Sequence, residues 1–153
     1  MVVKFVEPTI EMVESIASDM RQADVDEIWE SSGSRPLDGL MSSWKASKLV
    51  TVVVIDDVPC VMLGLVITDT ISGAGIPWLL GTNEALKHKR EFLRLVPDVI
   101  DEMFELCTLL YNYVHVKNRV SVVWLKRIGF KFDKAVPIGA NKEMFYKFSL
   151  SRG

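Results

Sequence analysis

The sequence predicts a single α/β (α+β) domain in which strands and amphipathic helices follow one another along the chain. Apolar residues recur at helical spacing in several segments, whereas Leu49–Ile55 and Val61–Ile67 are dense apolar runs typical of buried strands. Both runs are far shorter than the ~20 residues needed to cross a bilayer. A chain of 153 residues, with 49% hydrophobic and 25% charged residues, has the size and composition of one globular domain. We therefore expect one domain over residues 1–153.

The N-terminal third is typical of one strand followed by three helices. Val2–Val6 alternates weakly and predicts a strand, after which Thr9 can cap a helix. A short second helix is expected over Asp24–Glu30, and Pro36 suits the first turn of a third. The apolar positions at helical spacing are Ile10, Val13, Ile16, Ala17 and Met20 in the first helix and Leu37, Leu40, Met41 and Trp44 in the third.

The middle of the chain predicts a β-hairpin, a strand and a long helix. Leu49–Ile55 and Val58–Thr68 flank Asp56-Asp57, which suggests a longer loop than Asp-Gly would. Ile76–Leu80 is expected to be the next strand. Apolar residues then keep helical phase across Pro97, and we favour one kinked helix over two helices. These residues are Phe92, Leu95, Val96, Val99, Ile100, Met103, Phe104, Cys107 and Leu110.

The last third contains a strand–Asn–helix–Gly unit. Tyr113–Val116 predicts a strand, Asn118 can cap a helix over Arg119–Ile128, and Gly129 suits a left-handed C-cap. An ordinary strand-turn-helix packing unit is the alternative interpretation. Two short strands, near Phe130–Phe132 and Met144–Phe148, are expected around a turn at Gly139-Ala140-Asn141.

Charge and cysteine content narrow the functional classes. The net charge of −2 gives no global reason to propose nucleic acid or an anionic membrane as a partner, although local basic clusters remain possible. The charged N-terminal residues argue against a secretory signal, and we expect a cytosolic protein. Cys60 and Cys107 have no ligand-like spacing, so we expect reduced core thiols and no metal site.

The unit from Tyr113 to Phe130 resembles the late motif of GNAT-type N-acetyltransferases, which grips coenzyme A. The order of predicted elements is similar to that family over nearly the whole chain. GNAT-like proteins of short-tailed bacteriophages, including internal virion proteins, are the closer resemblance. The segments that carry it are Trp78–Thr82, Lys87–Phe92, Asn112–Val114 and Trp124–Phe130. The resemblance implies a central mixed sheet of about six to seven strands flanked by helices, and a location in the host-cell cytoplasm or the virion.

For the cofactor, the resemblance implies acetyl-CoA in a gap between the parallel strands Ile76–Leu80 and Tyr113–Val116. A backbone N–H of the first strand would polarise the thioester carbonyl. The cofactor contacts would come from Leu80, Gly81 and Thr82, from Asn118 and Ser121, and from Lys87, His88, Lys89 and Arg90 near the pyrophosphate. The basic run stands where the family has glycines. It can clamp phosphates, obstruct the site or form a solvated helix face.

The catalytic residues are less defined by the resemblance. Many family members place a Tyr where this chain has Leu125, so Tyr113 is one candidate acid; packing is its simpler role. Glu84 and His115 are candidate bases, although a histidine in an apolar strand is more often structural. Glu27 lies, by analogy, among the family's substrate-side helices.

Two functions are therefore expected, and they belong to different classes. One is an acyl-CoA-dependent N-acetyltransferase that acts directly on a small-molecule or protein amine. The other is a GNAT-fold protein that has lost transfer chemistry and binds a phage or host protein. The Asn118 motif favours the first, and the missing glycines and Leu125 favour the second.

Overall fold

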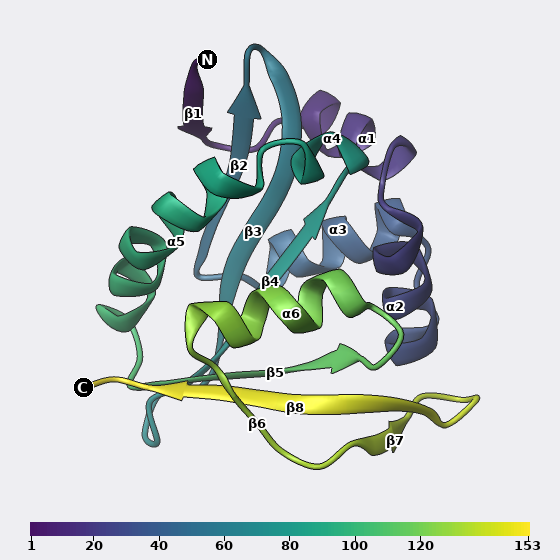
Figure 1. The fold of residues 1–153 in the computed structure, drawn as a ribbon, viewed down its shortest axis with the longest axis vertical. Helices are drawn as coiled ribbons and strands as arrows, with labels where there is room; N and C mark the ends of the chain where they lie inside the picture. The colour runs from purple at the N-terminus through teal and green to yellow at the C-terminus, as the bar shows by residue number, and fades with distance from the viewer.

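The computed structural model describes residues 1–153 and contains one mixed eight-stranded sheet with helices on both faces (Figure 1). The strands are β1 (Val3–Val6), β2 (Leu49–Ile55), β3 (Val58–Asp69), β4 (Ala74–Gly81), β5 (Leu109–His115), β6 (Lys131–Phe132), β7 (Val136–Ile138) and β8 (Glu143–Ser151). The helices are α1 (Ile10–Ser18), α2 (Gln22–Ser32), α3 (Pro36–Ala46), α4 (Asn83–Leu86), α5 (Lys89–Phe104) and α6 (Arg119–Ile128). None of the helices combines the length and apolar content needed to cross a membrane.

The sheet follows the order β1-β2-β3-β4-β5-β8-β6, with β7 also paired to β8. All neighbours are antiparallel except β4 and β5, which are parallel. This confirms the predicted α/β class and the mixed sheet. The eighth strand is β7, which no pattern in the sequence predicts, because three residues containing Pro137 carry no alternation.

Two apolar clusters hold the helices against the two faces of the sheet. On one face, α5 and α6 cover a cluster built from alternate residues of β3, including Val61, Leu63 and Leu65. On the other face, α1 and α3 cover a second cluster around Val52 and Met62. The strand period of two therefore divides the apolar residues of β2 and β3 between two cores.

Several local predictions are confirmed. The Oγ1 of Thr9 accepts a hydrogen bond from the Met12 N–H at 3.2 Å, and Pro36 occupies the first turn of α3. Helix α6 has the predicted bounds, and Gly129 ends it with φ 114°. Helix α5 continues through Pro97 as one helix.

Two local predictions are wrong. The β2–β3 loop has only two residues, Asp56 and Asp57, with φ 48° and 68°. This left-handed turn is held by the residue before β1, because the Asp56 Oδ1 accepts the Val2 N–H at 2.8 Å and the Asp56 N–H donates to the Val2 carbonyl at 2.9 Å. The long helix ends at Phe104, although helical phase continued to Leu110, because Cys107 and Leu110 reach the same core from a loop and from β5.

Gly139 gives a stability prediction, because it lies against the end of α2. A Cβ at Gly139, where φ is 81°, would overlap the Glu30 carbonyl oxygen, whereas a Cβ at Gly129, which also has positive φ, would meet nothing within 4 Å. We expect Gly139→Ala to lower the free energy of unfolding by about 2 kcal/mol, of which about 1 kcal/mol is backbone strain. Gly129→Ala carries only the strain. Urea unfolding of both variants checks this, and equal losses would contradict the predicted clash.

Candidate active site

The candidate site begins where β4 and β5 separate. Their parallel pairing consists of Ala74 with Leu109 and Gly75 with Leu110, and beyond these pairs the two strands diverge (Figure 1). Two residues further along each strand, the Asn112 side chain spans the gap. Its Nδ2 donates to the Pro77 carbonyl at 2.7 Å, and its Oδ1 accepts from the Tyr113 N–H at 2.7 Å. The predicted pair of strands is therefore adjacent and splayed.

A cavity of about 330 Å³ occupies this gap. It is lined from one face of the sheet by α5 and α6 and from the other by α2, α3 and β7, so it passes between the strands. Of its 29 lining residues 23 are hydrophobic, and this makes it suited to an apolar chain. The polar or titratable side chains in its wall are Glu27, Ser31, Ser43, Asn112, Tyr113 and Ser121, with the indoles of Trp78 and Trp124.

Leu79 presents unpaired backbone groups to the gap. Alternate residues of a strand direct their N–H and C=O to opposite sides. Pro77 and Gly81 face away from β3, because the Pro77 carbonyl accepts from Asn112 and the Gly81 carbonyl accepts from the Arg21 N–H at 2.9 Å. Leu79 lies between them in the same register and therefore faces the gap too. Its N–H is placed to donate to a group bound there.

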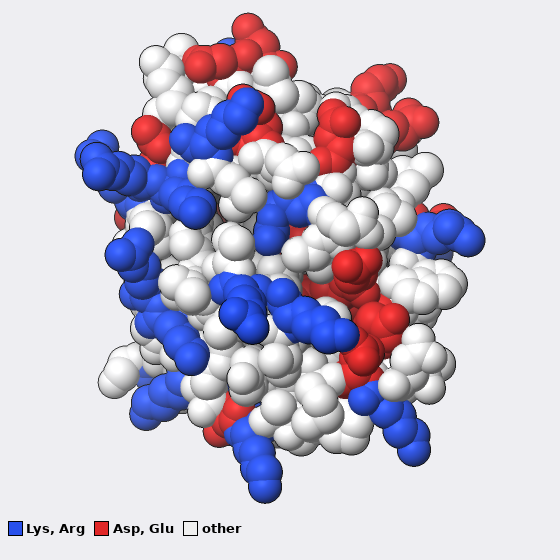
Figure 2. Space-filling view, turned by 45° about the vertical axis from the view of Figure 1, so that its right-hand side comes forward, with Lys and Arg blue, Asp and Glu red and all other residues white.

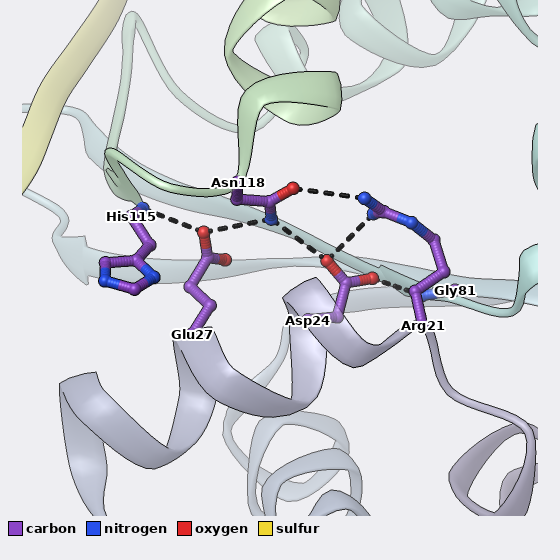
Figure 3. A network of polar contacts seen from close by, with 6 residues as sticks. All are labelled: Arg21, Asp24, Glu27, Gly81, His115 and Asn118. Carbon is purple, nitrogen blue, oxygen red and sulfur yellow. Dashed lines mark hydrogen bonds and ion pairs between the residues drawn. The ribbon is translucent and has the colours of Figure 1, made fainter.

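A buried polar network closes the open end of the gap (Figure 3). The Asn118 Oδ1 accepts from the Arg21 Nη2 at 3.1 Å, and its Nδ2 donates to the Asp24 Oδ1 and the Glu27 Oε1, both at 3.2 Å. Arg21 and Asp24 form an ion pair at 3.0 Å. The Gly81 N–H donates to the Asp24 Oδ2 at 3.0 Å. The network thus ties α2 to the ends of β4 and β5.

Burial raises the pKa of both carboxyls in this network. Asp24 is 2% exposed, and its burial raises the pKa of its carboxyl, against the lowering effects of Arg21, the Gly81 N–H and the Asn118 amide. Burial, and then the nearby Asp24 charge, raises the pKa of Glu27 to about 7. The His115 N–H and the Asn118 amide oppose that increase. A carboxyl with a pKa near neutrality in a cavity wall is a recurrent feature of functional sites.

The structure gives Asn118 a different role from the predicted cap. Its side chain makes no capping bond to α6, because all three of its polar bonds go to Arg21, Asp24 and Glu27. It is 1% exposed and does not line the cavity. Asn118 therefore holds the start of α6 in place.

The other predicted cofactor residues fall into two groups. The first group lies at the cavity: Ser121 and Leu80 line it, and Lys89 lines a smaller hollow of about 60 Å³ beside it, together with Ser121. The second group already has hydrogen-bond partners within the protein. Both backbone groups of Gly81 have partners, and the Thr82 N–H and Oγ1 both donate to the Cys60 carbonyl.

The basic run precedes and begins α5. Lys87 pairs with Glu84 at 3.0 Å, and both side chains are largely exposed. His88 is the N-cap residue of α5 and makes no side-chain cap, so the first N–H groups of this helix are available to an anion. Figure 2 shows Lys and Arg side chains over the left half of one face and an acidic group to the right of its centre.

The predicted catalytic residues are dispersed. Tyr113 lines the cavity. His115 is 4% exposed, its Nε2 lies 3.0 Å from the Glu143 Oε1, and its ring packs on Phe145. Glu84 lies on α4 outside the cavity wall.

Three contributors were not assigned from the sequence. Arg21 and Asp24 belong to no motif of the sequence, and Leu79 faces the gap with its backbone. The one available sign was a pair of charged residues, Arg21 and Asp24, three positions apart at the start of a helix. Nothing local indicated that they face β4.

Comparison with known proteins supplies the fold family. Residues 70–136 match the family described as "Bacteriophage T7, probable scaffold protein Gp13". No curated protein matches the sequence. Among solved structures, Ard1 from Thermoplasma volcanium is similar with a TM-score of 0.75 and 13% identity, over 100% of this chain and 99% of that one.

Two further solved structures carry ligands in their descriptions. The protein yncA from Salmonella typhimurium, described with its cofactor acetyl-CoA, has a TM-score of 0.72 and 13% identity over 100% of this chain and 95% of its own. Spermidine N-acetyltransferase from Vibrio cholerae, in complex with CoA and spermine, has a TM-score of 0.70 and 14% identity over 98% of this chain and 95% of its own. The chain therefore has the GNAT fold.

Proposed function

We propose that the chain is a phage-encoded, acyl-CoA-dependent N-acetyltransferase of GNAT type. In the proposed reaction, acetyl passes directly from acetyl-CoA to a small-molecule or protein amine in the host-cell cytoplasm. The observation that carries the proposal is the apolar cavity that passes between the diverging strands β4 and β5, with the backbone of Leu79 facing it. The shared fold with acetyltransferases supports it.

The residues present suit such a cofactor. The apolar wall formed by α5 and α6 fits a pantetheine arm, and Ser121 offers it a hydroxyl. At the start of α5, the free N–H groups and the Lys87, His88, Lys89 and Arg90 side chains favour phosphate. Acetyl-CoA, when bound, supplies the acetyl thioester. The Leu79 N–H is suited to stabilise negative charge on the thioester oxygen, because it is fixed in a strand before reaction begins.

The roles of the remaining predicted residues follow from their positions. Tyr113 is the proposed source of a proton for the departing thiolate, because its side chain lines the cavity and Leu125 has no proton to donate. His115 and Glu84 suit proton abstraction less well, since His115 is engaged by Glu143 and Glu84 lies outside the cavity. We assign Asn118 a positioning role through the α2 network.

A pair of substitutions on α6 tests the cofactor site. Ser121 lines the cavity, whereas Val123 is 59% exposed on the same helix. We expect Ser121→Phe to weaken acetyl-CoA binding at least tenfold, because the ring would fill the space of the pantetheine arm, and Val123→Phe to leave it unchanged. Isothermal titration calorimetry measures both. Absence of saturable binding by the unmodified protein at millimolar acetyl-CoA would refute the proposed function.

The match to the T7 scaffold family favours a second candidate function. In this alternative, the GNAT fold serves as a structural or interaction component of a phage, within the virion or bound to a host protein. Absence of acetyl-CoA binding together with co-sedimentation of the chain with purified phage particles would support it. Saturable binding and amine acetylation would favour the enzyme.

A further inference from the structure

Glu27 holds an unusual position in the cavity. It lies on α2, and its Oε1 accepts hydrogen bonds from the His115 N–H at 2.9 Å and from the Asn118 Nδ2 at 3.2 Å (Figure 3). These two bonds fix the carboxylate at the end of β5. Neighbouring wall residues from α2, α3 and β7 are Ile28, Ser31, Ser43 and Ile138, on the face of the sheet opposite α5 and α6.

The second oxygen of Glu27 is free. No hydrogen bond reaches the Oε2, and no buried side-chain oxygen or nitrogen in the structure lacks a partner, so this oxygen has access to solvent. Glu27 is also the only charged residue among those that line the cavity. An acceptor amine entering from the α2 side would therefore meet one fixed carboxylate and otherwise uncharged walls.

We infer that Glu27 is the catalytic base of the acceptor side, and that it selects primary or secondary amines whose remaining substituents are largely apolar. This inference rests on the proposed function. In the step, the amine nitrogen forms a bond to the acetyl carbon, the carbon–sulfur bond breaks, and its electron pair leaves with sulfur. The Glu27 Oε2 takes the proton that nitrogen loses, and the thiolate takes a proton from Tyr113 or solvent.

The surrounding charges make this role possible near neutral pH. From its own helix and N-cap, the Asp24 and Arg21 charges act on Glu27. From β5, the His115 N–H donates to it and Tyr113 lines the same cavity, while Glu143 of β8 pairs with the His115 ring. The wall residues from α3 and β7 are uncharged. Burial is the largest cause that raises the pKa of Glu27 to about 7, which is close to the optimum for a base at neutral pH.

Glu27→Gln tests the inference, with Glu30→Gln as the control one turn along α2. Acetyl-CoA would be supplied with phenethylamine, whose substituent is apolar, with spermine and with a lysine peptide from pH 6 to 9, and the released thiol measured. Phenethylamine should give the highest kcat/KM, and a higher kcat/KM for spermine would contradict the apolar selection. We expect Glu27→Gln to lower kcat/KM at least about 100-fold. In the unmodified protein kcat/KM should rise with pH around a midpoint near pH 7, and this rising limb of the pH–rate profile should be absent from Glu27→Gln. The Kd for acetyl-CoA should stay within about twofold, since the cofactor lies on the other face. Glu30→Gln should retain both the rate and the limb.

A second measurement does not need turnover. Carbon-13 NMR of glutamate carboxyls, with Glu27→Gln to assign the signal, should show Glu27 titrating near pH 7 in the free protein. A midpoint below pH 5, or a Glu27→Gln variant that keeps the rate and the limb, would overturn the assignment while acetyl-CoA binding stands. If acetyl-CoA does not bind, the proposed function fails and this inference fails with it.

Discussion

Replacing Asp24 with alanine should lower the free energy of unfolding by about 3 to 5 kcal/mol. Asp24 is 2% exposed and accepts from the Arg21 guanidinium, the Asn118 amide and the Gly81 N–H. Its removal takes the ion-pair partner from the buried Arg21 guanidinium and the acceptor from the Gly81 N–H, and it leaves the Asn118 amide with Glu27 as its one remaining acceptor. A buried charge that loses its partner is among the most destabilising changes known for single substitutions. The loss would be a large part of the ~5–15 kcal/mol typical of a domain.

Asp26→Ala is the matched control, because Asp26 lies two positions along the same helix and accepts only an exposed bond from Gln22 at 2.8 Å. We expect its effect to stay within about 0.5 kcal/mol. Urea unfolding followed by tryptophan fluorescence measures both variants. Adding Arg21→Ala to Asp24→Ala should cost less than Arg21→Ala alone, since the two side chains are coupled. A loss below about 1 kcal/mol for Asp24→Ala would contradict the importance of the network.

Much of the fold followed from local patterns. Helix α6 was predicted with its observed bounds because its apolar stripe and Gly129 both lie within the segment. The long strands β2 and β3 were predictable because their apolar runs are bounded by the Asp56-Asp57 turn. Element α4 was missed, since a single helical turn has no period to detect.

The candidate site was predictable only in part. The sequence placed the two strands of the gap and Ser121, since these follow from the order of elements and from the family resemblance. The partners of Asn118 lie 91 to 97 positions away, on Arg21, Asp24 and Glu27. The local pattern therefore predicts that the Asn118 side chain caps its own helix. A single sequence does not show which distant side chains will hydrogen-bond the Asn118 amide in place of the α6 backbone.

The role of Leu79 could not be read from its side chain. Its relevance depends on the register between β3 and β4 and on the loss of pairing between β4 and β5. Both are properties of the assembled sheet. Gly81 and Thr82 were expected to contact the cofactor, yet their backbone groups are engaged by Arg21, Asp24 and Cys60. The contact to a thioester is therefore proposed one step earlier along β4.

Glu27→Gln should stabilise the protein at pH 8 by about 2 to 3 kcal/mol and have little effect near pH 4.5. Burial raises the pKa of Glu27 from 4.5 to about 7 in the folded state, so the folded state holds this proton more tightly than the unfolded state. Below pH 4.5 both states are protonated and the group contributes no pH dependence. As the pH rises from 4.5 to 7 stability is lost, and above 7 the full cost of the buried charge is present. Glutamine carries no charge, and its carbonyl oxygen can accept the same two bonds from His115 and Asn118.

Urea unfolding at several pH values between 4.5 and 8 measures the effect, with Glu102→Gln on the exposed surface of α5 as the control. The control should follow the unmodified protein at every pH. A stability difference for Glu27→Gln that does not change with pH would show that Glu27 titrates alike in both states, contrary to its burial. A stabilised variant that has also lost acetyl transfer would mean that the chain retains a costly buried carboxylate because the reaction requires it.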